Sequence, residues 1–176
     1  VVLICRYEAS LISGNYSYIF FVSCLLTVVF SASAAFFYSD TKKIIALSTC
    51  NNISWCFIYL YSGNVELCLL QLTCHGVFKC LLFCLIGDFL VNSNNSQNKS
   101  MHFYHGSSSY QFLISGICLF ISGAPFLGVY FSKHIFIAYI SDVSSLLILL
   151  LTVIGISLSF LYTFRLLDIL NNGNNS

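Results

Sequence analysis

The run of residues from Tyr16 to Tyr38 contains no charged side chain. It exceeds the ~20 apolar residues that an α-helix needs to cross the hydrocarbon core of a bilayer. Three further runs of sufficient length occupy residues 44–62, 65–91 and 144–170. Because backbone N–H and C=O groups cannot stay unpaired in lipid, such runs must form helices. The sequence therefore predicts four membrane-spanning helices.

The low share of charged residues agrees with this interpretation. Of the 176 residues, 58% are hydrophobic and only 7% are charged, whereas soluble domains carry about 25% charged residues. Such a chain cannot cover its own surface in water. Its formal net charge of +1 creates no field that would attract nucleic acid, so we expect no nucleic-acid partner.

Residues 110–140 form a fifth apolar segment, which is too long for one straight span. A continuous helix of this length would measure about 46 Å, against ~30 Å for the hydrocarbon core. Gly123, Pro125 and Gly128 lie in its middle, and proline removes a backbone donor from a helix. We therefore predict an all-α, polytopic transmembrane bundle of about five to six helices, with one discontinuous helix near Gly123–Gly128.

One long polar segment, residues 92–109, interrupts the apolar runs. It is rich in Asn and Ser and lacks apolar periodicity, which is typical of an exposed loop. His102 and His105 lie in this segment and are interpreted as solvated loop residues. Residues 1–176 are otherwise predicted to form a single transmembrane domain.

The nine cysteines fall almost entirely within the apolar runs, where a free cysteine behaves as a small hydrophobic residue. Cys74, His75, Cys80 and Cys84 come closest to a metal-binding set. However, the chain has no C-x-x-C pair, and helical spacing spreads these four residues around the axis. We therefore expect packing cysteines and no metal site.

Lys79 lies near the middle of the predicted helix 65–91. It is about 18 to 21 Å from either end, too far for its side chain to reach an interface. Lysine at that depth costs roughly 2.5 to 3.5 kcal/mol. Gln71 and His75 precede it at intervals of four residues, so all three lie on one stripe of the helix. A cation, an imidazole and an amide that can hold water are the parts of a proton path.

A second intramembrane lysine, Lys133, follows the predicted helix break and precedes His134. Broken helices that carry ionisable residues are a frequent feature of ion-transport sites near the bilayer midplane. The alternative is an interfacial lysine beside a simple proline kink, and residue spacing leaves both interpretations open.

Asp40, Lys42 and Lys43 lie at the junction of the first two predicted spans. Charged side chains at such a junction are typical of interfacial anchors, and their spacing allows an ion pair. From spacing alone we predict both.

Four segments of the chain together resemble a known family. They are DTKKIIALST (Asp40 to Thr49), LTCHGVFKCLLF (Leu72 to Phe83), GAPFLGVYFSK (Gly123 to Lys133) and LYTFRLL (Leu161 to Leu167). In this order they resemble the antiporter-like subunits of respiratory complex I. The PF followed by FSK resembles the chain 5 members of that family.

The resemblance implies a proton-translocating module with no cofactor of its own, since NADH, FMN, iron–sulfur clusters and ubiquinone are bound by other subunits of the complex. By motif position, Lys79 corresponds to the central relay lysine and His75 to the relay histidine. Lys133 corresponds to the lysine on the late broken helix of the family. Lys42 matches the first basic residue of a D-x-K-K/R motif, which by this resemblance makes it a proton-relay residue and more than an anchor, and Asp40 matches the aspartate of the motif as a supporting residue.

The resemblance also implies a multi-pass protein of the mitochondrial inner membrane, in contact with lipids and with other membrane-arm subunits. Family members contain two inverted repeats and a lateral helix, whereas this chain resembles the second repeat alone. Either another chain supplies the first repeat, or the sequence is a piece of a longer protein.

Two positions depart from the family pattern. Gln71 stands where the family often has a histidine, and an amide cannot carry a proton as a cation, so a relay there would use water. His134 stands where an aspartate usually follows the lysine, which leaves the charge partner of Lys133 open.

Three functions fit these residues. The leading one is a proton-translocating membrane-arm subunit of NADH:ubiquinone reductase, with no redox chemistry in this chain itself. The alternatives are a subunit of a multisubunit cation/proton antiporter and a structural piece of the membrane arm that pumps nothing.

Overall fold

The computed structural model describes all of the chain except residues 8, 10–11, 15, 93–107, 144–145 and 172–176. Every regular element in the described part is a helix, so the predicted all-α class is confirmed. The helices are α1 (Val2–Cys5), α3 (Ser17–Phe37), α4 (Thr41–Tyr61), α5 (Val65–Asn92), α6 (Ser108–Ser122), α7 (Gly128–Val143) and α8 (Leu146–Asn171).

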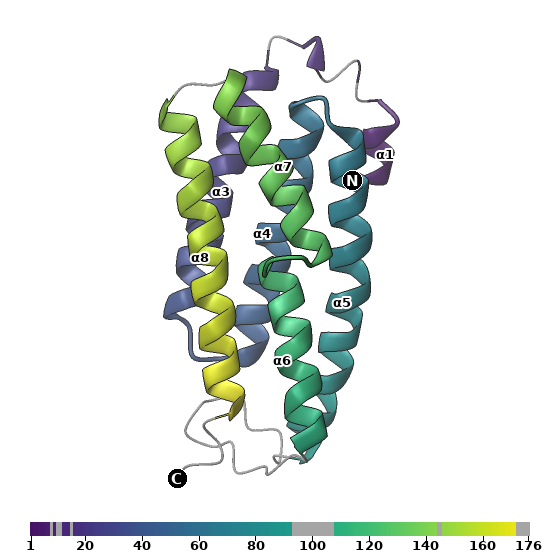
Figure 1. Ribbon diagram of the computed structural model, residues 1–176, viewed down its shortest axis with the longest axis vertical. Helices are drawn as coiled ribbons and strands as arrows, with labels where there is room; N and C mark the ends of the chain where they lie inside the picture. The colour runs from purple at the N-terminus through teal and green to yellow at the C-terminus, as the bar shows by residue number, and fades with distance from the viewer. Residues whose placement is uncertain (8, 10–11, 15, 93–107, 144–145, 172–176) are drawn as a thin grey trace.

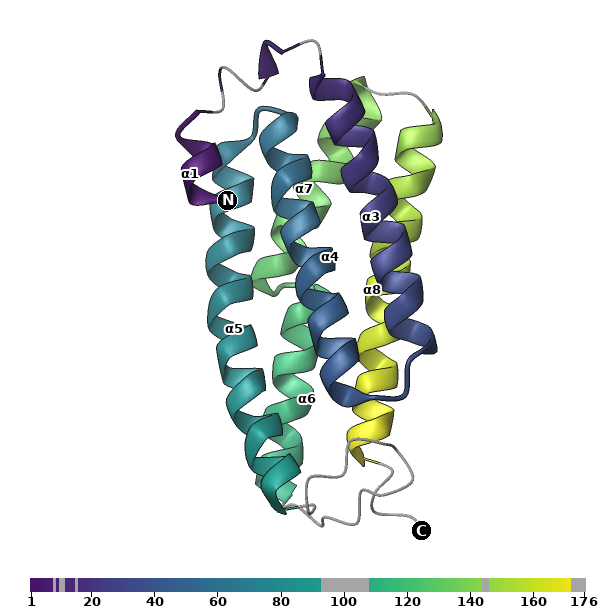
Figure 2. The ribbon, with the colours of Figure 1, turned by 180° about the vertical axis from the view of Figure 1, so that it is seen from behind.

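The long helices run side by side along the long axis of the molecule (Figures 1 and 2). In the described part of the chain, α3, α4, α5 and α8 are each long and apolar enough to cross a membrane, as predicted. Of these four, α4 is the least apolar and the most buried, and it packs against α3, α5 and α8. It begins at Thr41, earlier than the predicted 44, so the two lysines of the junction lie in its first turn.

The helices α6 and α7 are stacked end to end and together span the height of the bundle (Figure 1). The first half, α6, ends at Ser122 and is followed by Gly123, whose φ of 86° is a left-handed conformation that favours glycine. Its N–H and that of Ala124 bond back to the carbonyls of Phe120 and Leu119, at 3.3 and 3.1 Å, which is the Schellman arrangement for ending a helix. The predicted discontinuous helix is thus confirmed.

The second half, α7, begins at Gly128, where two helices approach closely. A Cβ atom on this glycine would lie 2.7 Å from Cys74 Sγ of α5, nearer than real Cβ contacts. Glycine is therefore required here for packing, and its small size sets the distance between α5 and α7.

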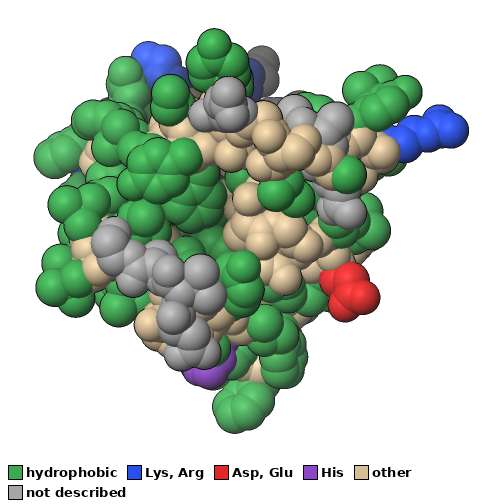
Figure 3. All heavy atoms as spheres, turned by 90° about the horizontal axis from the view of Figure 1, so that it is seen from above, with side chains coloured by type: hydrophobic (Ala, Val, Ile, Leu, Met, Phe, Trp, Pro, Cys, Tyr) green, Lys and Arg blue, Asp and Glu red, His purple; other side chains and the backbone are tan. Residues whose placement is uncertain are grey.

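Apolar side chains fill the bundle and also cover its outside. One buried cluster lies around Ile45, Leu82 and Leu166, and another around Trp55 and Phe136. Seen from above, the end of the molecule shows mostly apolar side chains and few charged ones (Figure 3). Apolar side chains both inside the bundle and on its surface are expected of a helical bundle that is surrounded by lipid.

The polar loop predicted for residues 92–109, with His102 and His105, falls mainly outside the described residues. At its two ends, α5 extends to Asn92 and α6 starts at Ser108.

Candidate functional site

The side chain of Lys79 lies in the interior of the bundle. Only 4% of it is exposed. Its Nζ donates hydrogen bonds to the carbonyl oxygen of Ile45, at 3.1 Å, and to the hydroxyl of Ser48. Both acceptors are neutral and belong to α4, so two hydrogen bonds tie this lysine of α5 to the neighbouring helix.

Lys133 of α7 is buried to the same degree, with 3% of its surface exposed. Its Nζ donates to the carbonyl oxygen of Ser122 and to the hydroxyl of Ser159, each at 3.0 Å. Ser122 is the last residue of α6, where the carbonyls of a helix have no partner within the helix. The ammonium therefore caps the end of the first half-helix, which also carries the negative end of the helix dipole.

His75 is within electrostatic reach of both lysines. It is 7% exposed, one turn before Lys79 on α5, and the charges of both Lys79 and Lys133 act on it. Its Nδ1 atom is buried and has no hydrogen-bond partner among the described residues. An imidazole whose Nδ1 has no such partner can accept or release a proton at that atom.

Gln71 completes the predicted stripe and is fully buried. Its Nε2 donates to Asn52 Oδ1 of α4 at 2.9 Å, and its Oε1 accepts from the hydroxyl of Ser132 of α7 at 2.6 Å. Asn52 in turn donates to the carbonyl oxygen of Ser48 at 2.8 Å. The amide that the sequence suggested as a holder of water is thus bonded to two side chains of other helices.

Several polar residues of the site were missed by sequence reasoning. They all lie at buried positions of α4, α7 and α8 and contact the stripe or the lysines, and they are Ser48, Asn52, Ser132 and Ser159. A usable signal was present in α4, where Ser48 and Asn52 are spaced by four residues and therefore lie on one face of the helix. Asn51 lies beside them and donates to the hydroxyl of Tyr162 at 3.4 Å.

The remaining predicted side chains, at the start of α4 and beside Lys133, are less buried than those of the two lysines. At the start of α4, Lys42 is exposed, while Lys43 forms an ion pair with Asp40 at 2.9 Å. The ion pair predicted for this junction is therefore present. His134 is exposed on α7, where its ring lies 5.3 Å from that of Tyr130.

The helix break borders a small pocket of about 100 Å³. Gly123, Pro125, Lys133 and His134 contribute to its lining, so the buried lysine and the exposed histidine reach the same space. Of the two buried lysines, Lys133 is the one that borders this pocket.

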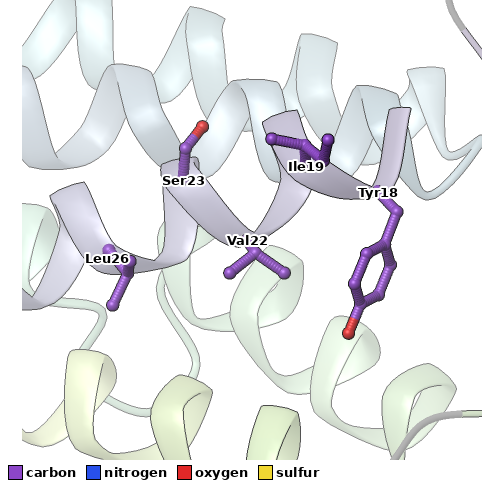
Figure 4. A pocket seen from close by; sticks show the side chains of 5 residues that line it. All are labelled: Tyr18, Ile19, Val22, Ser23 and Leu26. Atoms are coloured by element: carbon purple, nitrogen blue, oxygen red, sulfur yellow. The ribbon is translucent and has the colours of Figure 1, made fainter. Parts of the chain in front are cut away.

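A second pocket, of about 290 Å³, lies on α3 and has a different character. Figure 4 shows its lining, in which Tyr18 and Val22 point the same way from one face of the helix. Apart from Tyr18 and Ser23, its lining residues are aliphatic, and it holds neither buried lysine. It is therefore a feature of the apolar exterior and carries none of the chemistry of the site.

The described residues contain no group of three or more His, Cys, Asp or Glu side chains that could hold a metal ion. The site consists instead of two ammonium groups, one imidazole and the neutral groups that bind them. Such a set can hold and pass protons.

Comparison with known families gives a match over most of the chain. Residues 1–159 match the family described as NADH:quinone oxidoreductase/Mrp antiporter, TM.

Individual relatives share the same printed name, NADH-ubiquinone oxidoreductase chain 5. The chain is 31% identical to that protein of Locusta migratoria over 182 residues, which cover 100% of this chain and 31% of the relative. It is 27% identical to the protein of Apis mellifera ligustica over 98% of this chain and 31% of the relative. For Balaenoptera physalus the identity is 32%, over 81% of this chain and 24% of the relative. The chain thus spans between about a quarter and a third of the length of these curated relatives.

Proposed function

The chain belongs to the NADH:quinone oxidoreductase/Mrp antiporter transmembrane family, and from this membership we propose that it forms part of a proton-translocating membrane-arm subunit of respiratory complex I. The names of its relatives support this assignment. The observation that carries it is the burial of Lys79 and Lys133 in the bundle interior, where each ammonium donates hydrogen bonds to two neutral oxygens. Buried lysines are expensive in a membrane and are retained where they act.

In the proposed mechanism, Lys79 and Lys133 each hold a proton and His75 passes protons between them. The free Nδ1 of His75 is the atom that would receive the proton from one side. Because both lysine charges act on this ring, the charge on either lysine changes how strongly the ring holds a proton. A proton leaving one lysine therefore favours uptake from the other.

The chain itself would contribute no redox chemistry. NADH oxidation, with FMN, the iron–sulfur clusters and ubiquinone, belongs in this proposal to other subunits of the complex. In this proposal the chain contributes residues of the proton path and nothing else to the reaction. Residues 1–176 would form a single transmembrane domain, which is the second of two inverted repeats.

The partners in this proposal are lipids and other membrane-arm subunits of the mitochondrial inner membrane, including the segment or chain that supplies the first repeat. Lys42 is exposed at the start of α4 and is free to contact such a partner. We assign Asp40 to holding the start of α4 through Lys43. His134 would exchange protons at the mouth of the pocket beside Lys133.

A second candidate function is a subunit of a multisubunit cation/proton antiporter, which the description of the family also covers. Sodium-dependent proton exchange in the absence of NADH dehydrogenase subunits would favour it. A structural piece that pumps nothing is the third candidate, and Gln71 supports it because its amide is occupied by two side chains.

The experiment that tests the leading proposal is a Lys79→Met substitution in the intact complex, reconstituted in vesicles. We expect proton uptake driven by NADH to be lost while the complex still assembles. Lys43→Met is the matched control, because the Lys43 side chain is 60% exposed and outside the site. Undiminished proton pumping in the Lys79→Met variant would remove this lysine from the mechanism and refute the proposal.

A further inference from the structure

A chain of hydrogen bonds joins three helices beside the two lysines. Ser132 of α7 donates to Gln71 of α5, which donates to Asn52 of α4, which donates to the carbonyl oxygen of Ser48. Ser132, Gln71 and Asn52 are each at most 1% exposed. The proton path proposed above uses none of them as a proton carrier.

The donor-to-acceptor direction of this series of hydrogen bonds is fixed by the group at its end on α4. The carbonyl oxygen of Ser48 can only accept, so Asn52 must turn its amide nitrogen toward it and its oxygen toward Gln71. Gln71 must then offer its nitrogen to Asn52 and its oxygen to Ser132. The hydroxyl of Ser132 therefore donates to Gln71, although the carbonyl oxygen of Val129 lies within 3.0 Å as an alternative acceptor.

The chain of hydrogen bonds cannot itself conduct protons. A neutral amide neither gains nor loses a proton at physiological pH, and turning either amide over would place like atoms against each other. This series of hydrogen bonds is therefore a fixed link between α4 and α7. At its two ends lie the lysines, since Lys133 follows Ser132 directly and Lys79 donates to the hydroxyl of Ser48.

We propose that Gln71 is a positioning residue, which docks α7 onto α4 and so fixes Lys133 relative to Lys79. The docking itself does not depend on proton transfer. Its consequence for the lysines rests on the proposed function.

Trp55 offers a direct measure of this docking. It is the only tryptophan of the chain, is fully buried, and follows Asn52 by one turn of α4. Its ring meets that of Phe136, one turn after Ser132 on α7, edge to face with centroids 6.2 Å apart. Separation of α7 from α4 would open this contact to lipid chains.

The experiment uses the full chain in nanodiscs made of phosphatidylcholine with brominated acyl chains, which quench tryptophan emission on contact. In the Gln71→Leu variant, Asn52 Oδ1 loses its partner while buried. We expect the ratio of docked to undocked chains to fall about tenfold, as is typical for a buried polar group left unpaired. Quenching of Trp55 should rise accordingly.

The Gln71→Glu variant tests the direction of the link. A protonated carboxyl group can still donate a hydrogen bond to Asn52 Oδ1. A carboxylate has only acceptor oxygens and cannot donate to it. Quenching should therefore equal that of the wild type at low pH and rise as the carboxyl group loses its proton. A side chain that only fills space would show no such pH profile.

Other titratable groups lie around this link, namely His75 one turn along α5, Tyr59 of α4 beside Ser132, Tyr162 of α8 beside Asn52, and Lys133, which follows Ser132 on α7. The wild-type chain is measured over the same pH range to account for them. Gln111→Glu, on the half-buried glutamine of α6, is the matched control and should leave quenching flat.

Unchanged Trp55 quenching in both variants of position 71 would overturn the positioning role. Raised quenching in Gln71→Leu, together with reduced proton pumping in the intact complex, would support it. If quenching rises in Gln71→Leu but proton pumping is undiminished, Gln71 docks α7 onto α4, and the proposal that this docking positions Lys133 relative to Lys79 is overturned. Failure of the proposed function alone would appear differently, as undiminished pumping in the Lys79→Met variant.

Discussion

Lys133 Nζ lies 3.0 Å from the carbonyl oxygen of Ser122, so a side chain of the second half-helix caps the end of the first. The break in the helix and the buried charge are therefore one structural unit. The break exposes carbonyl oxygens that need a donor, and the lysine needs acceptors inside the membrane.

The left-handed turn at Gly123 is needed for this arrangement. A Gly123→Ala substitution should destabilise the chain by about 1–2 kcal/mol, because an L side chain disfavours a φ of 86°. Its Cβ would also lie 3.4 Å from Lys133 Cδ. Thermal unfolding in nanodiscs measures the effect. Gly116→Ala in α6 is the control and should be neutral or stabilising, since no atom lies within 4 Å of its Cβ.

The close approach of α5 and α7 makes a second prediction. Gly128→Ala should destabilise the chain by about 1–3 kcal/mol, because its Cβ would lie 2.7 Å from Cys74 Sγ. Removing the sulfur in a Gly128→Ala/Cys74→Ala double variant should recover most of this loss. The melting temperatures of the single and double variants decide the matter. Equal loss in both would show that Cys74 is not the obstacle. Gly76→Ala serves as the control, with open space around its Cβ.

His75 should matter for function and not for folding. Its buried Nδ1 has no partner among the described residues, so His75→Leu removes an unpaired polar atom and should not lower the melting temperature. Proton pumping in the intact complex should nevertheless fall by about a hundredfold, the low end of the range for a proton-transferring group. A stable variant that pumps normally would contradict the relay role of this histidine.

The ion pair between Lys43 and Asp40 at the start of α4 should contribute little to the free energy of unfolding. Because the side chains of Lys43 and Asp40 are 60% and 24% exposed, solvent screens their attraction, and Asp40→Asn should change stability by less than about 1 kcal/mol. The difference in melting temperature from the wild type should shrink further in high salt. A large loss that persists in salt would mean that Asp40 has another partner.

Much of the fold could be predicted because it depends on local sequence. The absence of charge between Tyr16 and Tyr38 requires a spanning helix wherever its neighbours lie. Likewise Gly123, Pro125 and Gly128 interrupt a helix through their own backbone properties. The burial of Lys79 followed from its distance to both ends of α5.

The partners of the buried groups could not be predicted in this way. The helices α4 and α5 have almost no hydrophobic asymmetry, so their sequences do not indicate which face meets which neighbour. Gln71 in particular could face water or protein, and only the packing of α4, α5 and α7 places Asn52 and Ser132 against it.

The sequence by itself determined how many apolar helices form, where one of them breaks and which charged residues lie in the membrane, because each of these follows from the chemistry of consecutive residues. The tertiary structure alone decided that Ser122 and Ser159 bind Lys133 and that Ser48 binds Lys79. Those contacts join residues of different helices, and they exist only because the helices pack at one particular rotation and depth.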